Sequence, residues 1–574
     1  MFLFGTHRSV AQRLRLFTER GLGAGNFFWH AWKVASDRDR PLLFHPDVDS
    51  PTWEEEKLEG LSLDDIRVTV IRYAHWYREH GVTTGSHVGV ITRHGLFGLL
   101  HHIAVTSLGA TAVHCNPRMA PATAAEYFLR TETRLVIGDD TLLEACTQAW
   151  TTAGKKDTPR LQDIHALDAD ARAPRRPLPG FPHPHSTDDL IMISHSSGTT
   201  GRPKAPVFHH GSFFRGKRER LWTFPSRRTD RLLTALPHSH SAGISYLSMA
   251  ILLGIPTLIL DDADGEKTVR AINVFHPTTV LGFPLTLAEI DPGKILPEAA
   301  QDIHTWNGMG DASHERHVRP LVALGRRGHG AKKTPGSVYL DGLGSSEMGM
   351  VLFKQAYTTQ TSNYGRLIGT PARVVRSAAV LDASGRHAPA GQAGRLGVRT
   401  PSVTPGYWDD PQLNQDSLVN GYFLTGDIVR RDTEGRWYHL DRTTDVINSA
   451  TGEIYSLPLE EVVLMTTGAL DAAVVAVDGP GTSTTQVPAA VVHYADDTER
   501  TPAEVLLACN AALDRAGLAR LHALVLTAAR AELPVGVTGK VLKRQLRETH
   551  RRLLHEPTTD AVAITVPDGP PRTA

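Results

Sequence analysis

Short apolar runs that alternate with helix-like stretches constrain the fold of this chain most strongly. The alternation extends from about Ser62 to Asp382. Runs of this kind are typical of buried strands in parallel sheets, which need crossover helices between them. We therefore predict an α/β fold of stacked, parallel-rich sheets with helices. The predicted strands cover residues 88–92, 135–137, 190–193, 232–236, 257–260 and 338–340.

The segment that begins at Ser62 shows the helical pattern. Ser62 and Asp65 have the spacing of a capping box, apolar residues recur on one stripe from Ile66 to Ala74, and Gly81 stands where such a helix would end. We predict a helix here. By contrast, residues 156–187 are polar and proline-rich, which indicates a surface connection into the next strand.

The chain of 574 residues is too long for one hydrophobic core. A polar stretch, DRTTDVINSATGE, follows the apolar residues 437–440 and indicates a domain boundary. We predict a large N-terminal domain over residues 1–441, a small α+β domain over 442–556 and a disordered tail over 557–574. In the small domain, 474–477 and 489–492 have the pattern of strands, and Thr501 has the pattern of a helix cap.

Composition favours an enzyme that acts on small molecules. Lys plus Arg and Asp plus Glu both number 61, so no global field favours nucleic acid or an anionic membrane. Cys115, Cys146 and Cys509 form no CxxC pair, which excludes a disulfide framework and a thiolate zinc site. No apolar run is long enough to span a bilayer or to form a signal-peptide core, so we expect a cytoplasmic protein without a membrane span.

A Ser/Thr/Gly-rich loop directly follows the predicted strand 190–193. Residues 194–204 have the sequence SHSSGTTGRPK. Clustered backbone N–H groups and hydroxyls, with the cation of Lys204, suit a polyphosphate. The GxxxxGK[ST] spacing of a Walker loop is absent, so a different phosphate-binding loop is indicated.

This loop resembles the phosphate-loop signature of the adenylate-forming superfamily, which comprises acyl- and aryl-CoA ligases, the adenylation domains of peptide synthetases and beetle luciferases. Further motifs of that superfamily occur in its order from about residue 60 to 545. The resemblance implies a mobile C-terminal domain. It also implies that the nucleotide phosphates contact Lys204 and the loop residues Ser196, Ser197, Gly198, Thr199, Thr200 and Gly201, with Thr199 also at the metal.

The segment LPHSHSAG resembles the superfamily's Pro-x-x-His-x-x-Gly motif and implies that His240 lies beside the reacting acid. Relatives that activate amino acids carry an Asp where this chain has Ser241. Because a buried ammonium needs a counter-charge, an α-amino acid substrate is disfavoured.

The segment DGLGSSEMG is similar to the Tyr-Gly-x-Thr-Glu motif. The resemblance implies that Ser346 contacts the α-phosphate and that Glu347 is catalytic and holds Mg²⁺. Leu343 replaces the aromatic residue that stacks on adenine. The nucleotide site implied by this motif and by NGMGDA before it includes Gly310, Asp311, Gly342, Leu343, Gly344, Ser345 and Ser346, with Gly344 also at the substrate.

Two further motifs lie near the predicted boundary. By resemblance, Asp427 accepts hydrogen bonds from the ribose hydroxyls and Arg442 contacts the same sugar. Asp441 and Thr444 replace the usual Gly and hinge Asp, which predicts an altered domain rotation. Gly452 matches the glycine that lets a pantetheine arm pass close to the backbone.

The segment LPVGVTGK matches the Pro-x-x-x-x-Gly-Lys motif, which implies that Lys540 is the catalytic lysine. Its ammonium would bridge the substrate carboxylate and the α-phosphate. Two histidine pairs, His209 with His210 and His314 with His317, have no third ligand at a fixed spacing, so a zinc site there is disfavoured.

These motifs predict an AMP-forming acid–thiol ligase. ATP and Mg²⁺ would activate an organic acid as acyl-AMP with release of pyrophosphate, and a thiol, with coenzyme A as the predicted acceptor, would displace AMP. Open alternatives are a carrier-protein phosphopantetheine, an amine, a non-carboxylate oxyanion, luciferase-like oxidation and a non-catalytic AMP-binding regulatory protein. The acid and the oligomeric state are not encoded in any of these motifs.

Overall fold

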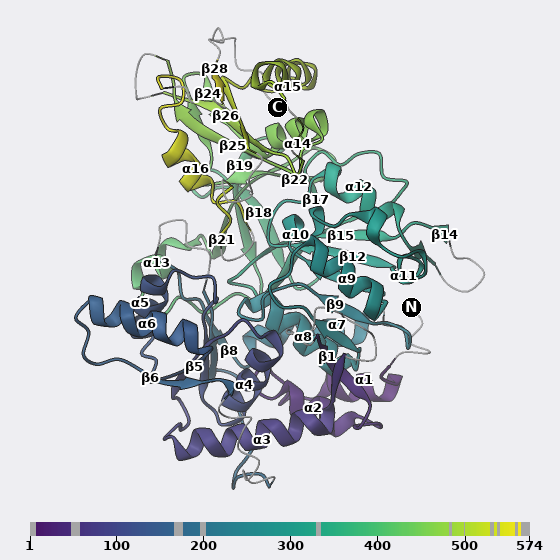
Figure 1. Ribbon diagram of the computed structural model, residues 1–574, viewed down its shortest axis with the longest axis vertical. Coiled ribbons are helices and arrows are strands. Elements are labelled where there is room, and N and C mark those ends of the chain that lie inside the picture. Colours follow the sequence, from purple (N-terminus) through teal and green to yellow (C-terminus); the bar gives the residue numbers. More distant parts are fainter. Residues whose placement is uncertain are drawn as a thin grey trace.

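The computed structural model describes residues 7–46, 58–165, 176–195, 202–224, 226–328, 334–480, 485–496, 498, 500–527, 533–536, 540–556 and 561–563. Two large sheets with helices form the body of the molecule, and a smaller α+β part lies above them in Figure 1. The predicted α/β fold with a large N-terminal and a small C-terminal domain is therefore confirmed.

The larger sheet has a parallel centre and an antiparallel extension. β1, β10, β9, β11, β12 and β15 pair in parallel, and β16 onward pairs antiparallel. In spatial order its strands are β18 (Ser377–Leu381), β19 (Ala393–Arg399), β21 (Tyr422–Arg431), β22 (Trp437–Arg442), β17 (Leu367–Pro371), β16 (Met350–Tyr357), β15 (Val338–Ser345), β12 (Thr305–Met309), β11 (Thr279–Gly282), β9 (Leu232–Thr234), β10 (Thr257–Ile259), β1 (Pro41–His45) and β2 (Glu59–Ser62), with β20 (Leu418–Val419) beside β21.

The second sheet is parallel except at its β7–β8 edge. Its order is β6 (Arg160–Asp163), β5 (Leu135–Gly138), β3 (His87–Ile91), β4 (Thr111–His114), β7 (Leu190–Ile193) and β8 (Val207–His209). β6 lies inside the segment predicted to be only a surface connection. That prediction missed a strand because the polar residues of β6 sit at the sheet edge, half exposed.

Helices cover both sheets (Figure 1). They are α1 (Val10–Thr18), α2 (Phe27–Val34), α3 (Leu63–Glu79), α4 (Gly95–Ser107), α5 (Pro121–Arg130), α6 (Asp140–Thr152), α7 (Ser212–Thr223), α8 (Ser241–Leu253), α9 (Gly265–Phe275), α10 (Pro284–Ala288), α11 (Pro297–Asp302), α12 (Glu315–Ala323) and α13 (Pro411–Asp416). α3 begins with the predicted capping box, in which Ser62 Oγ accepts from the Asp65 amide and the Asp65 carboxylate accepts from the Ser62 amide.

α4 and α8 are buried between the layers. Neither helix has a continuous polar face, and nearly all of their residues are buried. A helix that is apolar all round is expected to pack against other elements on every side. The main hydrophobic cluster joins these two helices to α2, α3 and both sheets. The two sheets therefore form one body.

The C-terminal part has its own core, with β26 antiparallel to β25 and parallel to β27. Its elements are β23 (Ile447–Ser449), β24 (Gly452–Ile454), α14 (Ser456–Thr467), β25 (Asp471–Asp478), β26 (Gln486–His493), α15 (Pro502–Ala516), β27 (Ala523–Thr527), α16 (Lys543–His550) and β28 (Ala561–Ala563). β28 pairs with β27 and Val562 packs against the core, so these residues of the predicted tail are ordered strand.

The structure shows the state of the three cysteines and the character of the helices. Cys115, Cys146 and Cys509 are all buried and reduced. None of the helices in the described part of the chain has the length and apolar character needed to cross a lipid bilayer.

Candidate active site

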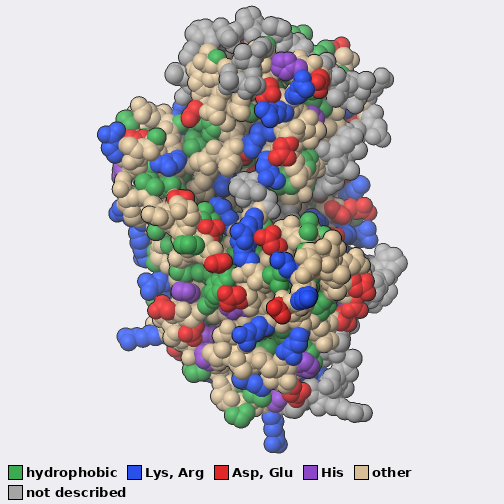
Figure 2. Space-filling view, turned by 90° about the vertical axis from the view of Figure 1, so that its left-hand side faces the viewer, with side chains coloured by type: hydrophobic (Ala, Val, Ile, Leu, Met, Phe, Trp, Pro, Cys, Tyr) green, Lys and Arg blue, Asp and Glu red, His purple; other side chains and the backbone are tan. Residues whose placement is uncertain are grey.

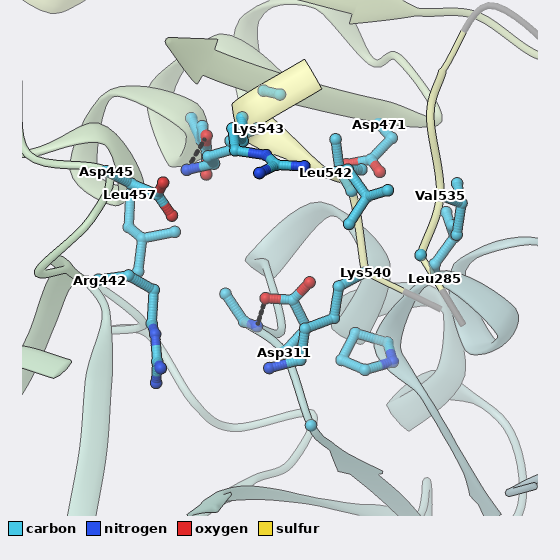
Figure 3. A pocket seen from close by; sticks show the side chains of 18 of the residues that line it. Leu285, Asp311, Arg442, Asp445, Leu457, Asp471, Val535, Lys540, Leu542 and Lys543 are labelled. Atoms are coloured by element: carbon cyan, nitrogen blue, oxygen red, sulfur yellow. Dashed lines mark hydrogen bonds and ion pairs between the residues drawn. The ribbon is translucent and has the colours of Figure 1, made fainter. Parts of the chain in front are cut away.

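A cavity of about 480 Å³ lies between the strand ends of the larger sheet and the C-terminal segment. Gly342–Gly344, Asp427 and Arg442 line it from β15, β21 and β22, and Lys540 lines it from the segment before α16. Figure 3 shows Lys540 pointing into this hollow from the C-terminal side, with Arg442 on its other side. On the face shown in Figure 2, Lys and Arg side chains gather where the small domain meets the body. The site is therefore a cleft between two domains, and both cations and carboxylates line it.

Asp427 and Arg442 form one wall of the cleft. They are register partners on β21 and β22, and Arg442 Nη1 lies 2.7 Å from Asp427 Oδ1. Although burial opposes ionisation, Arg442 and His439 hold the pKa of Asp427 well below its usual range. Asp427 Oδ2 is buried and has no hydrogen-bond partner among the described residues. An ionised oxygen of this kind can accept the two hydroxyls of a ribose.

Glu347 is held by two hydroxyl groups at the other end of the site. Ser345 Oγ donates to Glu347 Oε2, and Tyr407 Oη donates to Glu347 Oε1 at 3.0 Å. The Lys204 ammonium lies 5.6 Å from the centre of the Tyr407 ring. Burial and the Glu347 charge raise the pKa of Tyr407 well above its usual range, so Tyr407 stays a donor. The carboxylate of Glu347 offers hard oxygen ligands that fit Mg²⁺.

Tyr407 was missed by sequence reasoning. It lies 60 residues after Glu347 in the chain, between β19 and α13, and no local motif marks it. Only the packing of this loop against the turn after β15 reveals its role.

His240 caps α8 and faces the reacting position. Its Nδ1 accepts from the Ala242 amide at 3.2 Å, and its Nε2 lies 3.3 Å from Ser346 Oγ. Burial, together with the charges of His195 and Lys540, lowers the pKa of His240 to about 3. The ring is therefore neutral, with its proton on Nε2, and it can donate to an oxyanion.

A second, smaller cavity of about 100 Å³ adjoins His240. Its walls combine apolar and polar side chains. The apolar lining is Ala242, Tyr246, Phe283, Met309, Met350 and Val351, and the polar lining includes Lys204, His240, Ser346, Glu347, Arg442 and Lys540. This cavity is where an acid could meet the nucleotide.

The structure brings most of the predicted site residues together. Thirteen line one or both of these cavities: Lys204, His240, Gly310, Asp311, Gly342, Leu343, Gly344, Ser345, Ser346, Glu347, Asp427, Arg442 and Lys540. Ser196, Ser197, Gly198, Thr199, Thr200 and Gly201 lie outside the described residues.

Two predicted residues do not line these cavities. Ser241 is fully buried at the start of α8, where its Oγ donates to the Ser346 carbonyl at 3.0 Å. Gly452 is exposed in β24 at φ +125°, with open space around it. In this domain arrangement Ser241 positions the turn that carries Ser346, and Gly452 stands away from the reacting groups.

A buried charged network links the hinge to the small domain. The Asp441 carboxylate accepts from the Ser456 amide at 2.6 Å and from Ser456 Oγ at 2.8 Å. Lys543 Nζ donates to the same Oγ at 2.7 Å and lies 2.6 Å from Glu460 Oε1. Asp441 stands where the superfamily motif has glycine, and its hydrogen bonds connect β22 to α14 and, through Ser456, to Lys543 of α16. This arrangement places Lys540 over the cleft.

His314 and His317 join the domains. His314 Nδ1 lies 2.8 Å from Glu461 Oε2, and His317 Nε2 lies 2.8 Å from the Leu470 carbonyl. Within the described ranges, neither belongs to a group of three metal-ligating atoms. The pair therefore binds the small domain.

The fold and the site define an adenylate-forming enzyme. A profile described as AMP-binding enzyme matches residues 45–408. The chain belongs to this family, as the resemblance of its motifs predicted.

Curated relatives match nearly the whole chain. A 3-aminoavenalumate diazotase from Streptomyces sp is 32% identical over 565 residues, which cover 94% of this chain and 98% of the relative. A 2-succinylbenzoate–CoA ligase from Bacillus mycoides (strain KBAB4) is 23% identical over 88% of this chain and 96% of the relative. ATP-bound MatB from Rhodopseudomonas palustris has the same fold, with a TM-score of 0.75, 21% identity and coverage of 93% of this chain and all of that one.

The family match confirms the predicted class of AMP-forming, adenylating enzymes, and the CoA ligases among the relatives are of the predicted acid–thiol type. The acid and the acceptor differ among the relatives.

Proposed function

We propose that this enzyme adenylates a small oxyanion acid and that an amine displaces AMP, with nitrous acid and an arylamine as the substrate pair. This proposal uses two of the alternatives predicted from the sequence, a non-carboxylate oxyanion and an amine acceptor. The relative that is 32% identical to this chain is named a diazotase, whereas the 2-succinylbenzoate–CoA ligase is only 23% identical.

The size of the reaction cavity carries the proposal. The cavity beside His240 and Ser346 has a volume of about 100 Å³. Pockets that hold drug-sized ligands are much larger, at roughly 300–1,000 Å³. Tyr246, Phe283 and Met350 close this space. A nitrite ion or a very small acid fits there, and a long acyl chain does not.

The first half-reaction joins the oxyanion to the nucleotide. A nitrite oxygen attacks the α-phosphorus of ATP, and pyrophosphate leaves. Lys540 would bridge the attacking oxygen and the α-phosphate, and His240 Nε2–H would donate to the oxyanion. Asp427 and Arg442 would hold the ribose, while Lys204 and residues 196–201 would hold the phosphates. When bound, Mg²⁺ neutralises phosphate charge, and Glu347, with Thr199, would hold it.

The second half-reaction forms an N–N bond. The amine nitrogen attacks the nitroso nitrogen, the bond from that nitrogen to the AMP oxygen breaks, and AMP leaves. The amine nitrogen then loses a proton to give the N-nitroso arylamine, which tautomerises to a diazohydroxide. Protonation of the hydroxyl oxygen and loss of water yield the diazonium ion. A neighbouring cavity of about 280 Å³ shares Phe283 with the reaction cavity and provides room for the amine.

Transfer of a carboxylic acid to coenzyme A is the second candidate. It is favoured by the CoA ligases among the relatives and by Gly452, whose exposed backbone would let a pantetheine arm pass after a domain rotation. We propose that the small domain over residues 442–556 is the mobile part in either reaction.

Pyrophosphate release separates the two candidates. The enzyme is incubated with ATP and Mg²⁺ plus either nitrite and an aminoaryl acid, or a panel of carboxylic acids with coenzyme A or hydroxylamine. Diazonium is trapped as an azo dye with a naphthol, and reactions without ATP control for spontaneous diazotisation. Nitrite-dependent pyrophosphate and dye support the proposal. Release with a carboxylic acid and none with nitrite overturns it in favour of acyl transfer.

A further inference from the structure

A group of two histidines and one aspartate lies outside the cleft and the reaction cavity, and its aspartate lines the neighbouring cavity of about 280 Å³. His45 ends β1, Asp261 follows β10, and His94 caps α4. The ligating atoms of these three side chains all lie within 4.8 Å of one another. We infer that His45, His94 and Asp261 bind a divalent transition-metal ion, with Zn²⁺ as the probe.

The three side chains of the group lie close together, and a metal ion would replace the hydrogen bond between His45 Nε2 and Asp261 Oδ2. Asp261 Oδ1 accepts from the Gly95 amide at 2.6 Å, which fixes the carboxylate. Its Oδ2 lies 2.7 Å from His45 Nε2 and 3.8 Å from His94 Nδ1. The His45 and Asp261 side chains are only 13% exposed. A partly buried carboxylate oriented by a backbone amide is the support that metal ligands need.

The topology explains why these residues meet. β1 and β10 are parallel neighbours with Leu43 opposite Thr257. His45 and Asp261 therefore lie at the carboxyl ends of adjacent strands, on the same side of the larger sheet. His94 comes from the second sheet, after β3. A Cβ at Gly95 would lie 2.7 Å from Asp261 Oδ1, so the glycine permits the approach. A bound ion would thus connect the two sheets.

The ligand chemistry selects the kind of ion. Two imidazole nitrogens and one carboxylate oxygen, with a fourth position open to water, match three-ligand zinc sites. Calcium and magnesium prefer all-oxygen sets.

A second group, His94, Asp139 and His165, overlaps the first but is less suited to bind. The Arg93 guanidinium lies 3.9 Å from Asp139 Oδ2 and competes with a metal ion for this carboxylate, which also accepts from Thr92 Oγ1 at 2.6 Å and from the Arg93 amide at 2.9 Å. His165 is exposed. We therefore place the metal ion at His45, His94 and Asp261.

Metal binding is measured on the untagged full-length chain after treatment with EDTA. Zn²⁺ is titrated in competition with a chromophoric chelator, and Co²⁺ is added separately to record its visible ligand-field spectrum. We expect one high-affinity Zn²⁺ per chain, and an affinity at least about tenfold weaker in His94→Ala and in Asp261→Asn. The Co²⁺ spectrum of the wild type should indicate nitrogen ligation.

His276→Ala is the matched control, because His276 pairs with Asp302 at 3.1 Å outside any three-ligand group of the described residues. It should keep wild-type affinity. His183→Ala tests the third group, His183, His185 and Asp189, and should also leave the high-affinity event intact. Circular dichroism and melting without metal show that each variant is folded. The inference is overturned if the wild type binds no Zn²⁺ more tightly than folded His94→Ala. Asp261→Asn provides the same comparison should His94→Ala not fold.

Discussion

Arg442 binds one oxygen of the Asp427 carboxylate at 2.7 Å and leaves the other oxygen buried without a partner among the described residues. The guanidinium keeps the carboxylate ionised, and Asp427 lies in the wall of the cleft. A buried anion with a free acceptor is costly unless a ligand donates to it. The pair thus prepares the site for a ligand with hydroxyl donors.

Asp427→Asn should weaken AMP and ATP binding about 10- to 100-fold, because hydrogen bonds to a charged acceptor are worth about 1.5–3 kcal/mol. Isothermal titration measures the loss. Asp432→Asn is the control, since Asp432 pairs with Arg436 at 2.7 Å outside the cavities described above. Equal nucleotide affinity in Asp427→Asn and wild type would show that the ribose is held elsewhere.

Lys540→Ala should slow pyrophosphate release about 10²- to 10³-fold, or about 2–4 kcal/mol in the adenylating transition state, because Lys540 would meet the negative charge that develops there. Its melting temperature should match that of the wild type. Lys354→Ala removes an exposed lysine of β16 and should keep full activity. Normal pyrophosphate release by Lys540→Ala with the true acid would refute the assignment of this lysine.

Lys543→Met should destabilise the protein by about 3–5 kcal/mol, because it leaves the carboxylates of Glu460 and Asp441 buried without their cation. The shift of the urea midpoint measures it. Arg544→Met is the neighbouring control, since its pair with Glu548 at 3.7 Å is exposed and is worth at most about 1 kcal/mol. Similar shifts for the two variants would mean that the buried network does not hold the small domain.

Glu461 should make the contact between α12 and α14 sensitive to acid. Burial opposes its ionisation, but the hydrogen bond and charge of His314, with Arg366 and the Glu315 amide, lower the pKa of Glu461 from 4.5 to about 2. A depressed pKa means that the ionised form stabilises the folded state. This stabilisation is complete above about pH 4.5 and is lost as the pH falls toward 2.

Melting curves of wild type and Glu461→Gln across this pH range measure that effect. The wild type should be more stable above pH 4.5, and the difference should shrink steadily toward pH 2. A difference that is constant with pH would show that the carboxylate charge is not what joins the two helices.

Local patterns predicted several elements correctly. The capping box of Ser62 depends on hydrogen bonds within a few residues, and the strand at 190–193 shows as a short apolar run. The same reasoning missed β6 and β28, whose short strands form only because a neighbouring strand offers unpaired backbone groups.

Contacts between distant segments were beyond the reach of such patterns. Tyr407 donates to Glu347, and His45 meets Asp261 across 216 residues of chain. Asp441 was visible as a departure from the usual glycine, but its bonds to Ser456 were not. Each contact depends on how sheets and domains pack, which no single segment encodes.

By itself, the sequence determined the α/β class and the family, because apolar runs and motifs are local features of the chain, and the resemblance predicted which residues would face a nucleotide. Only the tertiary structure decided that Lys540 lies over the cleft, that the reaction cavity is small and that two histidines and an aspartate converge between the sheets. Cavity volume and ligand convergence depend on close packing of side chains from remote segments, and that packing exists only in the folded chain.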